Sequence, residues 1–168
     1  PFASAEAPTP DGAVSAALAT AFGDDLSPEA KARLGTRAIV VIRQGKLVAE
    51  RYAEGFTAQT RQLGWSMAKS VTDLLVGRLA EAGTVALSDA RLRPEWTDDR
   101  ARITMDDLLR MTSGLTWDET YALGTTITTM LYREADMAAY AASLPLAHPV
   151  GEYQQYSSGS TDIACSVL

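Results

Sequence analysis

The chain has 168 residues, a length sufficient for one domain with a hydrophobic core. Its composition, 46% hydrophobic and 21% charged, is that of an ordinary globular protein. The formal net charge of −6 argues against nucleic acid as a partner, because phosphate binding needs a basic surface. One cysteine excludes an internal disulfide, and one histidine excludes a metal site built on several histidines. No apolar run reaches the roughly 18 residues of a membrane-spanning helix, so we expect no membrane span.

The first third of the chain predicts a tail, two helices and a β-hairpin. Residues 1–10 are rich in proline and alanine, which is typical of a loose tail. Apolar residues four apart predict a helix over residues 11–22, and Ser27-Pro28 opens a second helix. Residues 38–42 are apolar and mostly β-branched, residues 43–46 have the composition of a turn, and residues 47–52 form a second run. Together they predict a β-hairpin. Because the first strand is apolar throughout, we expect it to be buried on both faces.

The rest of the chain is mainly helical in pattern. A capping box is predicted at Thr104–Asp107, with aspartate in place of the usual glutamate. Helical spacing is also present in residues 66–83, 128–132, 136–143 and from about 158 onward.

Ser66 and Lys69 form the only Ser-x-x-Lys sequence of the chain, at the start of one predicted helix. Residues three apart on a helix lie on the same side, so the hydroxyl and the amine are expected to face each other. A buried, neutral lysine can remove the serine proton, and a helix N-terminus favours the developing oxyanion. The pair predicts a nucleophile and its base; for so short a motif the alternative is a helix start with a solvated lysine.

Tyr156 stands immediately before Ser157-Ser158, at another predicted helix start. A phenol near an ammonium can share a proton with a serine hydroxyl and later protonate a leaving group. The alternative is an aromatic ring that packs beside a serine N-cap.

Taken together, these motifs resemble the serine β-lactamase and penicillin-binding-protein superfamily. Ser66-Met67-Ala68-Lys69 resembles its Ser-x-x-Lys motif, and Tyr156-Ser157-Ser158 resembles the Tyr-x-Asn/Ser motif of its class C-related branch. Residues 103–115 are similar to the segment that links the two motifs there, and residues 149–152 to the turn before the tyrosine. Within that branch, residues 65–70 and 156–161 are most similar to bacterial serine hydrolases grouped with aminohexanoate-dimer hydrolase.

The resemblance implies an α+β fold, an antiparallel sheet flanked by helices, of which residues 11–168 would be the N-terminal portion. It implies a hydrolase that cleaves an ester, amide or β-lactam of a small acyl substrate through an acyl-serine. Ser66 would be the nucleophile, Lys69 the base and Tyr156 the proton relay, with no cofactor and no metal. Ser158 would stand where many relatives have asparagine and would contact substrate.

Trp117 and Tyr121, with Asp118 and Glu119 between them, follow a Ser-Gly-Leu turn and are predicted to line the mouth of the substrate pocket. The alternative is a surface loop with a packed tryptophan.

The third motif of the family, Lys/His-x-Gly on a late strand, is missing from these 168 residues. That strand would supply one oxyanion donor, so the 168 residues alone are expected to be inactive. The expected partner is the remaining C-terminal part of the domain, from the same gene or a second chain. Two alternatives stay open: an inactive binding protein of this fold, and a half-domain that pairs with another polypeptide. The resemblance favours a periplasmic or secreted setting over a cytoplasmic one.

Overall fold

The computed structural model describes residues 10–168. It divides the chain into two compact units, one ending at Leu63 and the other beginning at Gly64. The predicted tail lies outside the described residues, apart from Pro10.

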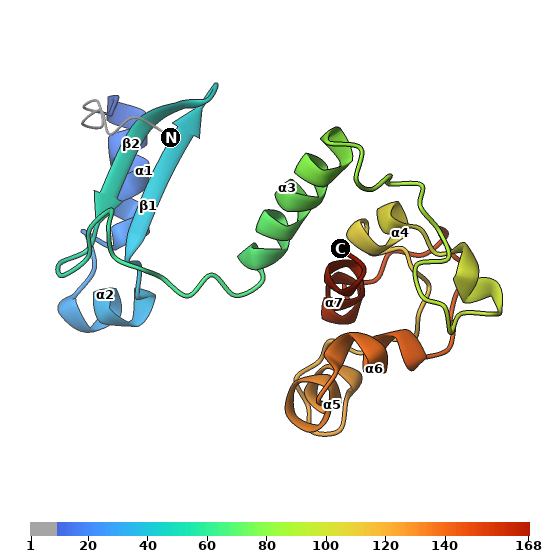
Figure 1. Ribbon diagram of the computed structural model, residues 1–168. Coiled ribbons are helices and arrows are strands. Elements are labelled where there is room, and N and C mark those ends of the chain that lie inside the picture. Colours follow the sequence, from blue (N-terminus) through green and yellow to red (C-terminus); the bar gives the residue numbers. More distant parts are fainter. Residues whose placement is uncertain (1–9) are drawn as a thin grey trace. The chain divides into compact units, whose positions relative to one another are not determined.

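The first unit contains two short helices and a β-hairpin (Figure 1): α1 (Gly12–Phe22), α2 (Pro28–Leu34), β1 (Ala38–Arg43) and β2 (Lys46–Tyr52). Each helix begins at a side chain that accepts a hydrogen bond from the first turn, Asp11 for α1 and Ser27 for α2. Each ends at a glycine in the left-handed conformation, which closes the last turn. The two helices predicted for this part of the chain are confirmed.

The hairpin joins β1 and β2 as an antiparallel pair. Gln44 and Gly45 form its turn with φ angles of 51° and 72°, the conformation of a tight hairpin. Val40 and Ile42 in β1 are 50% and 54% exposed. Within the first unit this face of β1 is uncovered, so the prediction that β1 is buried on both faces is wrong for that unit.

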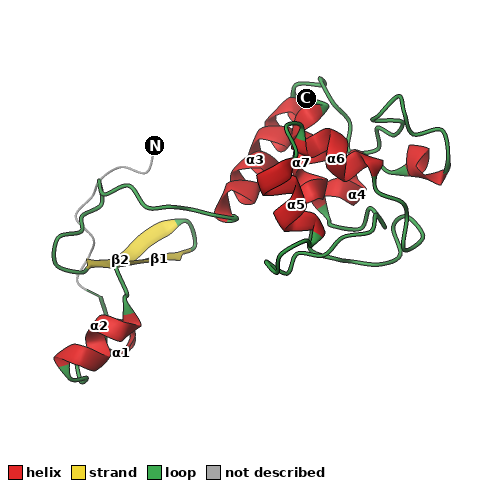
Figure 2. Cartoon of the chain, turned by 90° about the horizontal axis from the view of Figure 1, so that it is seen from below, coloured by secondary structure: helices red, strands yellow, loops and turns green. Residues whose placement is uncertain are grey.

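The second unit is helical, and Figure 2 shows its helices gathered into one cluster. Its elements are α3 (Met67–Glu81), the short 3-10 helix η1 (Asp99–Arg102), α4 (Met105–Leu109), α5 (Thr126–Arg133), α6 (Met137–Ser143) and α7 (Ser158–Ser166). The capping box of α4 is confirmed, because Thr104 and Asp107 each accept a backbone hydrogen bond from the other. Within residues 10–168 no helix combines the length and the apolar character needed to cross a bilayer.

Helix α7 lies at the centre of this unit, in contact with α3, α4, α5 and α6. Its residues Ile163 and Ala164 have no exposed surface. They belong to one hydrophobic cluster with Val76, Trp96, Ile103, Met105, Leu108, Leu115, Trp117, Ile127, Met130, Ala141 and Ala142. The position of the N-terminus of α7 is therefore set by packing in the core.

The segment before α7 is held by main-chain hydrogen bonds. Five of them, from 2.8 to 3.1 Å, join residues 111–116 to residues 145–155. Gly114 has a φ of 76°, and its carbonyl accepts two of the five bonds. This pairing fixes where Tyr156 leaves the segment and where α7 begins.

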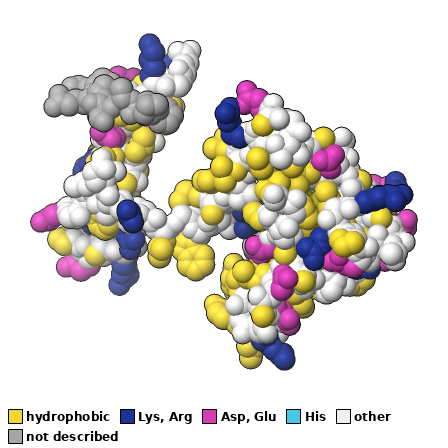
Figure 3. All heavy atoms as spheres, in the orientation of Figure 1, with side chains coloured by type: hydrophobic (Ala, Val, Ile, Leu, Met, Phe, Trp, Pro, Cys, Tyr) yellow, Lys and Arg dark blue, Asp and Glu magenta, His cyan; other side chains and the backbone are white. Residues whose placement is uncertain are grey.

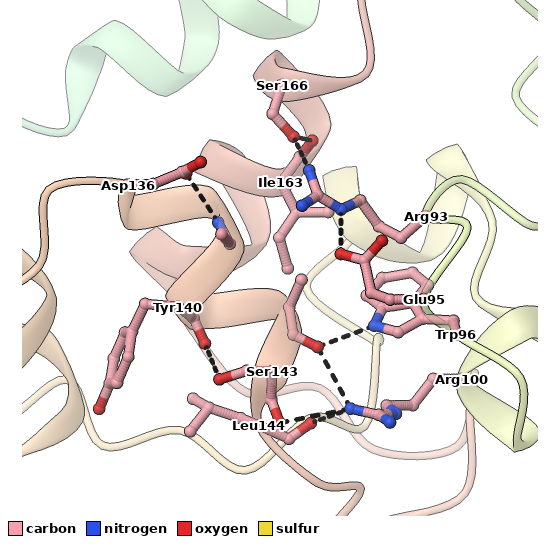
Figure 4. A network of polar contacts seen from close by, with 12 residues as sticks. Arg93, Glu95, Trp96, Arg100, Asp136, Tyr140, Ser143, Leu144, Ile163 and Ser166 are labelled. Atoms are coloured by element: carbon pink, nitrogen blue, oxygen red, sulfur yellow. Dashed lines mark hydrogen bonds and ion pairs between the residues drawn. The ribbon is translucent and has the colours of Figure 1, made fainter.

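Two side chains from the segment before α4 bind the C-terminus of α6 (Figure 4): Trp96 from a loop and Arg100 from η1. The Arg100 guanidinium donates to the carbonyls of Ala142, Ser143 and Leu144 at 3.2–3.3 Å, and the Trp96 indole donates to Ala142 at 2.8 Å. Carbonyls in the last turn of a helix have no partner within the helix, so these donors complete it.

A close approach at Gly159 fixes the depth of α7 in the core. A Cβ added there would lie 2.6 Å from the Trp117 ring and 2.8 Å from the Ala141 Cβ. Both neighbours belong to the packed core, so a side chain at this position would force the start of α7 outward.

We therefore expect Gly159→Ala to lower the free energy of unfolding of the full-length protein by about 1–3 kcal/mol, as overpacking does elsewhere. Urea denaturation measures the change. Gly77→Ala in α3 is the matched control, because a Cβ there would meet nothing within 4 Å and alanine is the better helix former. Equal stability of wild type and Gly159→Ala would contradict the close packing.

Candidate active site

A tight turn at Trp65 places Ser66 at the start of α3. Trp65 has a φ of 46°, unusual for a residue with a side chain, and Ser66 stands at the N-cap position. A serine at this position commonly caps the helix with its hydroxyl, but Ser66 makes no such bond. Its Oγ lies instead 3.1 Å from the Nζ of Lys69, one turn along the helix.

The Lys69 amine lies between two serine hydroxyls. Besides Ser66, its Nζ contacts the Oγ of Ser158 at 3.0 Å, although the two residues are 89 positions apart. Ser158 is the first residue of α7. The contact therefore joins the starts of the two helices that carry the Ser-x-x-Lys and Tyr-Ser-Ser motifs.

Tyr156 approaches the amine with the face of its ring. The Lys69 Nζ lies 5.0 Å from the ring centroid, a cation–π geometry. The side chain is 47% exposed, and its hydroxyl makes no hydrogen bond within residues 10–168. The structure thus brings Ser66, Lys69, Ser158 and the ring of Tyr156 together.

The sequence placed Glu119 beside the predicted mouth of the substrate pocket but gave it no contact and no role of its own. Its carboxylate accepts from the Ser158 hydroxyl at 2.6 Å, from the Ser158 backbone N–H at 2.9 Å, and from the indole N–H of Trp117. No local spacing signals this contact, since 39 residues separate Glu119 from Ser158. The one clue in the sequence is an acidic residue in the loop that follows the Ser-Gly-Leu turn.

The two other predicted substrate-contact residues lie in different surroundings. Trp117 is 6% exposed and packs in the hydrophobic cluster, so its visible role is to support Gly159 and Glu119. Tyr121 is 59% exposed and its hydroxyl makes no hydrogen bond within the described residues. A direct contact of either residue with substrate stays a prediction.

An open cavity of about 620 Å³ lies beside the site, between α3, α4 and α7. Lys69 borders it, together with Asp73, Asp106, Arg110 and Thr161. Lys69 therefore borders this cavity and also contacts Ser66.

Asp162 lies one turn after Ser158 on α7. Burial raises the pKa of its carboxyl above the ordinary value of 3.8; the nearby Lys69 acts in the opposite direction, and Glu119 in the same direction. Within residues 10–168 no group of three or more His, Cys, Asp or Glu side chains is arranged to hold a metal ion.

Two comparisons with known proteins found similarity, one with a family model and one with solved structures. The sequence model described as Beta-lactamase matches residues 16–167. A solved structure from Bacillus anthracis, described as a candidate 6-aminohexanoate-dimer hydrolase, is similar with a TM-score of 0.60 and 22% identity. The similarity covers 79% of this chain and 39% of that one, so the chain spans less than half the length of this neighbour. A search of curated proteins gave no match. The resemblance and the α+β fold class predicted from the sequence are confirmed.

The raised pKa of Asp162 leads to a prediction about stability. The folded protein keeps this proton to higher pH than the unfolded chain, so the wild type loses stability as the pH rises through and above 3.8. Asp162→Asn has no such proton, and we expect it to be more stable than wild type near pH 7 and equal to it well below 3.8. Thermal unfolding at the two pH values measures the difference.

Asp118→Asn is the control with the opposite sign. Hydrogen bonds from Thr120 lower the pKa of the Asp118 carboxyl, so its charge stabilises the fold above the ordinary value and its loss should destabilise it near pH 7. An Asp162→Asn protein that is less stable than wild type near neutral pH would contradict the raised pKa of the Asp162 carboxyl.

Proposed function

The chain belongs to the beta-lactamase family, and we propose that it carries the nucleophile and the base of a serine hydrolase that works through an acyl-serine. The observation that carries the proposal is the 3.1 Å distance between Ser66 Oγ and Lys69 Nζ at the start of α3. A hydroxyl becomes a useful nucleophile when a base at hydrogen-bond distance removes its proton as it attacks.

In the proposed acylation the neutral amine of Lys69 takes the Ser66 proton while Oγ attacks the carbonyl carbon of the substrate. The bond to the leaving group then breaks, and the leaving group receives a proton from the lysine, directly or through the Tyr156 hydroxyl. Water cleaves the acyl-serine by the same steps in reverse order, which returns the proton to Ser66. Tyr156 takes part only after its exposed side chain turns its hydroxyl toward the amine.

The oxyanion would be stabilised in part by the backbone N–H of Ser66. Within residues 10–168 this N–H has no acceptor, and it stands at the positive end of α3. A second donor would come from the remaining C-terminal part of the domain. Loss of one oxyanion donor typically lowers the rate about 10²–10³-fold, so we expect the 168 residues alone to be inactive.

The partner proposed for α3 is that same remaining part of the domain. Met67, Val71 and Leu74 are 57–70% exposed, and Figure 3 shows hydrophobic side chains gathered over this helix. An apolar helix face of this kind is ordinarily covered by protein. This exposed face is also what favours the second candidate, a half-domain completed by another polypeptide; intact mass of the native protein separates the two.

The substrate class follows from Ser158. An asparagine at this position would offer a carboxamide with fixed donors and an acceptor, whereas a serine hydroxyl offers one donor, and here Glu119 takes it. We therefore propose esters and short amides ahead of β-lactams. A screen of p-nitrophenyl esters, short amides and a chromogenic cephalosporin tests the order.

Our first functional prediction concerns covalent labelling. A fluorophosphonate probe should label the full-length protein at Ser66, and Ser66→Ala should abolish the label, with Ser70→Ala as the control from the same helix. Lys69→Ala should slow acylation by about 10²–10⁴-fold, because it removes the base. Equal labelling of wild type and Ser66→Ala would eliminate the proposal, and it would leave the inactive binding protein as the better account.

Our second functional prediction concerns the phenol. Tyr156→Phe keeps the ring over Lys69 but removes the hydroxyl, so we expect kcat for an amide substrate to fall about 10²-fold or more. The loss should be smaller for a p-nitrophenyl ester, whose leaving group needs no proton. Tyr132→Phe on α5, at an 80% exposed position, is the control. Equal effects on both substrates would show that Tyr156 does not deliver the proton.

A further inference from the structure

We propose that Glu119 is a positioning residue of this site: acting through Ser158, it fixes the direction of the hydrogen bonds around Lys69 so that the amine offers its lone pair to Ser66. The inference rests on the proposed function and adds a residue to it.

Three donors surround the Glu119 carboxylate. An ionised carboxylate only accepts hydrogen bonds, so the single hydroxyl proton of Ser158 must point at Glu119. The 2.6 Å distance is that of a charge-assisted O–H···O⁻ bond. The backbone N–H of Ser158 and the indole N–H of Trp117 occupy the other oxygen. The side chain is therefore held from two directions, and it cannot turn without losing bonds.

The direction of this bond determines what Ser158 offers to Lys69. With its proton committed to Glu119, the Ser158 Oγ has only lone pairs left, so the contact of 3.0 Å must be a bond donated by the lysine. A neutral amine has two N–H groups and one lone pair. Once one N–H is directed to Ser158, the lone pair can accept the proton of Ser66, 3.1 Å away. Without Glu119, Ser158 could donate its own proton to that lone pair and compete with the nucleophile.

Glu119→Gln in the full-length protein tests the inference. The glutamine amide can donate to the Ser158 Oγ and so reverse the bond. With a p-nitrophenyl ester we expect kcat/KM at its pH plateau to fall about 10- to 100-fold, less than the loss of a general base. Because Glu119 acts through Ser158, this loss should nearly disappear in a Ser158→Ala background. A residue with a merely structural role would lower kcat/KM by the same factor in both backgrounds.

The control is Asp136→Asn at the start of α6, a carboxylate that accepts from the Ala139 backbone N–H and lies outside the site; asparagine caps a helix equally well. We expect its kcat/KM to equal that of wild type. A Glu119→Gln protein with wild-type kcat/KM would overturn the inference.

A double-mutant cycle with Ser158→Ala tests whether Glu119 acts through Ser158. We expect Ser158→Ala alone to lower kcat/KM by at least about tenfold, and Glu119→Gln to add less than about threefold in that background. Losses that simply multiply would overturn the inference, as would wild-type activity of Ser158→Ala, which can be measured even if Glu119→Gln does not fold. If wild type is labelled at Ser66 but these variants behave like wild type, only this inference is refuted. If wild type is not labelled at Ser66, the proposed function is refuted as well.

Discussion

The close contact between Gly159 and the Trp117 ring determines where the site can form. Because no side chain separates them, α7 begins deep against the hydrophobic cluster, and Ser158 is held at the edge of that packing. The same indole ring donates to Glu119, which in turn binds the backbone and the hydroxyl of Ser158. One buried aromatic side chain thus sets the depth of the helix and, through a carboxylate, the orientation of its first residue.

The two sides of the site are held to different degrees. On the α7 side, Ser158 has three hydrogen-bond contacts, to Lys69 and twice to Glu119, and its neighbours are buried. On the α3 side, Ser66 is exposed, and of the helix only Val76 is fully buried within the described residues. The amine of Lys69 links Ser158, which Glu119 holds in place, to Ser66 on a sparsely packed helix. In the proposed mechanism the precision of the Ser66 position therefore depends on what covers α3.

The sequence predicted those features that depend on neighbours along the chain. The capping box at Thr104 and the Ser66–Lys69 pair follow from a spacing of three residues, and the structure contains both contacts. Glu119 could not be found in this way, because its partner is 39 residues distant and joined by packing. The expected burial of β1 failed for a related reason: an apolar strand can be buried, but its sequence does not say what covers it. Nor does spacing decide whether Tyr156 shows Lys69 its ring or its hydroxyl.

Glu119 and Asp162 both lie near Lys69, but the structure gives the two carboxyl groups different surroundings. Glu119 accepts hydrogen bonds from three donors, which keep its side chain in place. Asp162 accepts no hydrogen bond within residues 10–168, and burial raises the pKa of its carboxyl. Under our proposal Glu119 is therefore the group that fixes the hydrogen-bond direction at Lys69, because a carboxyl such as Asp162, which holds its proton more readily, could not serve as a constant acceptor.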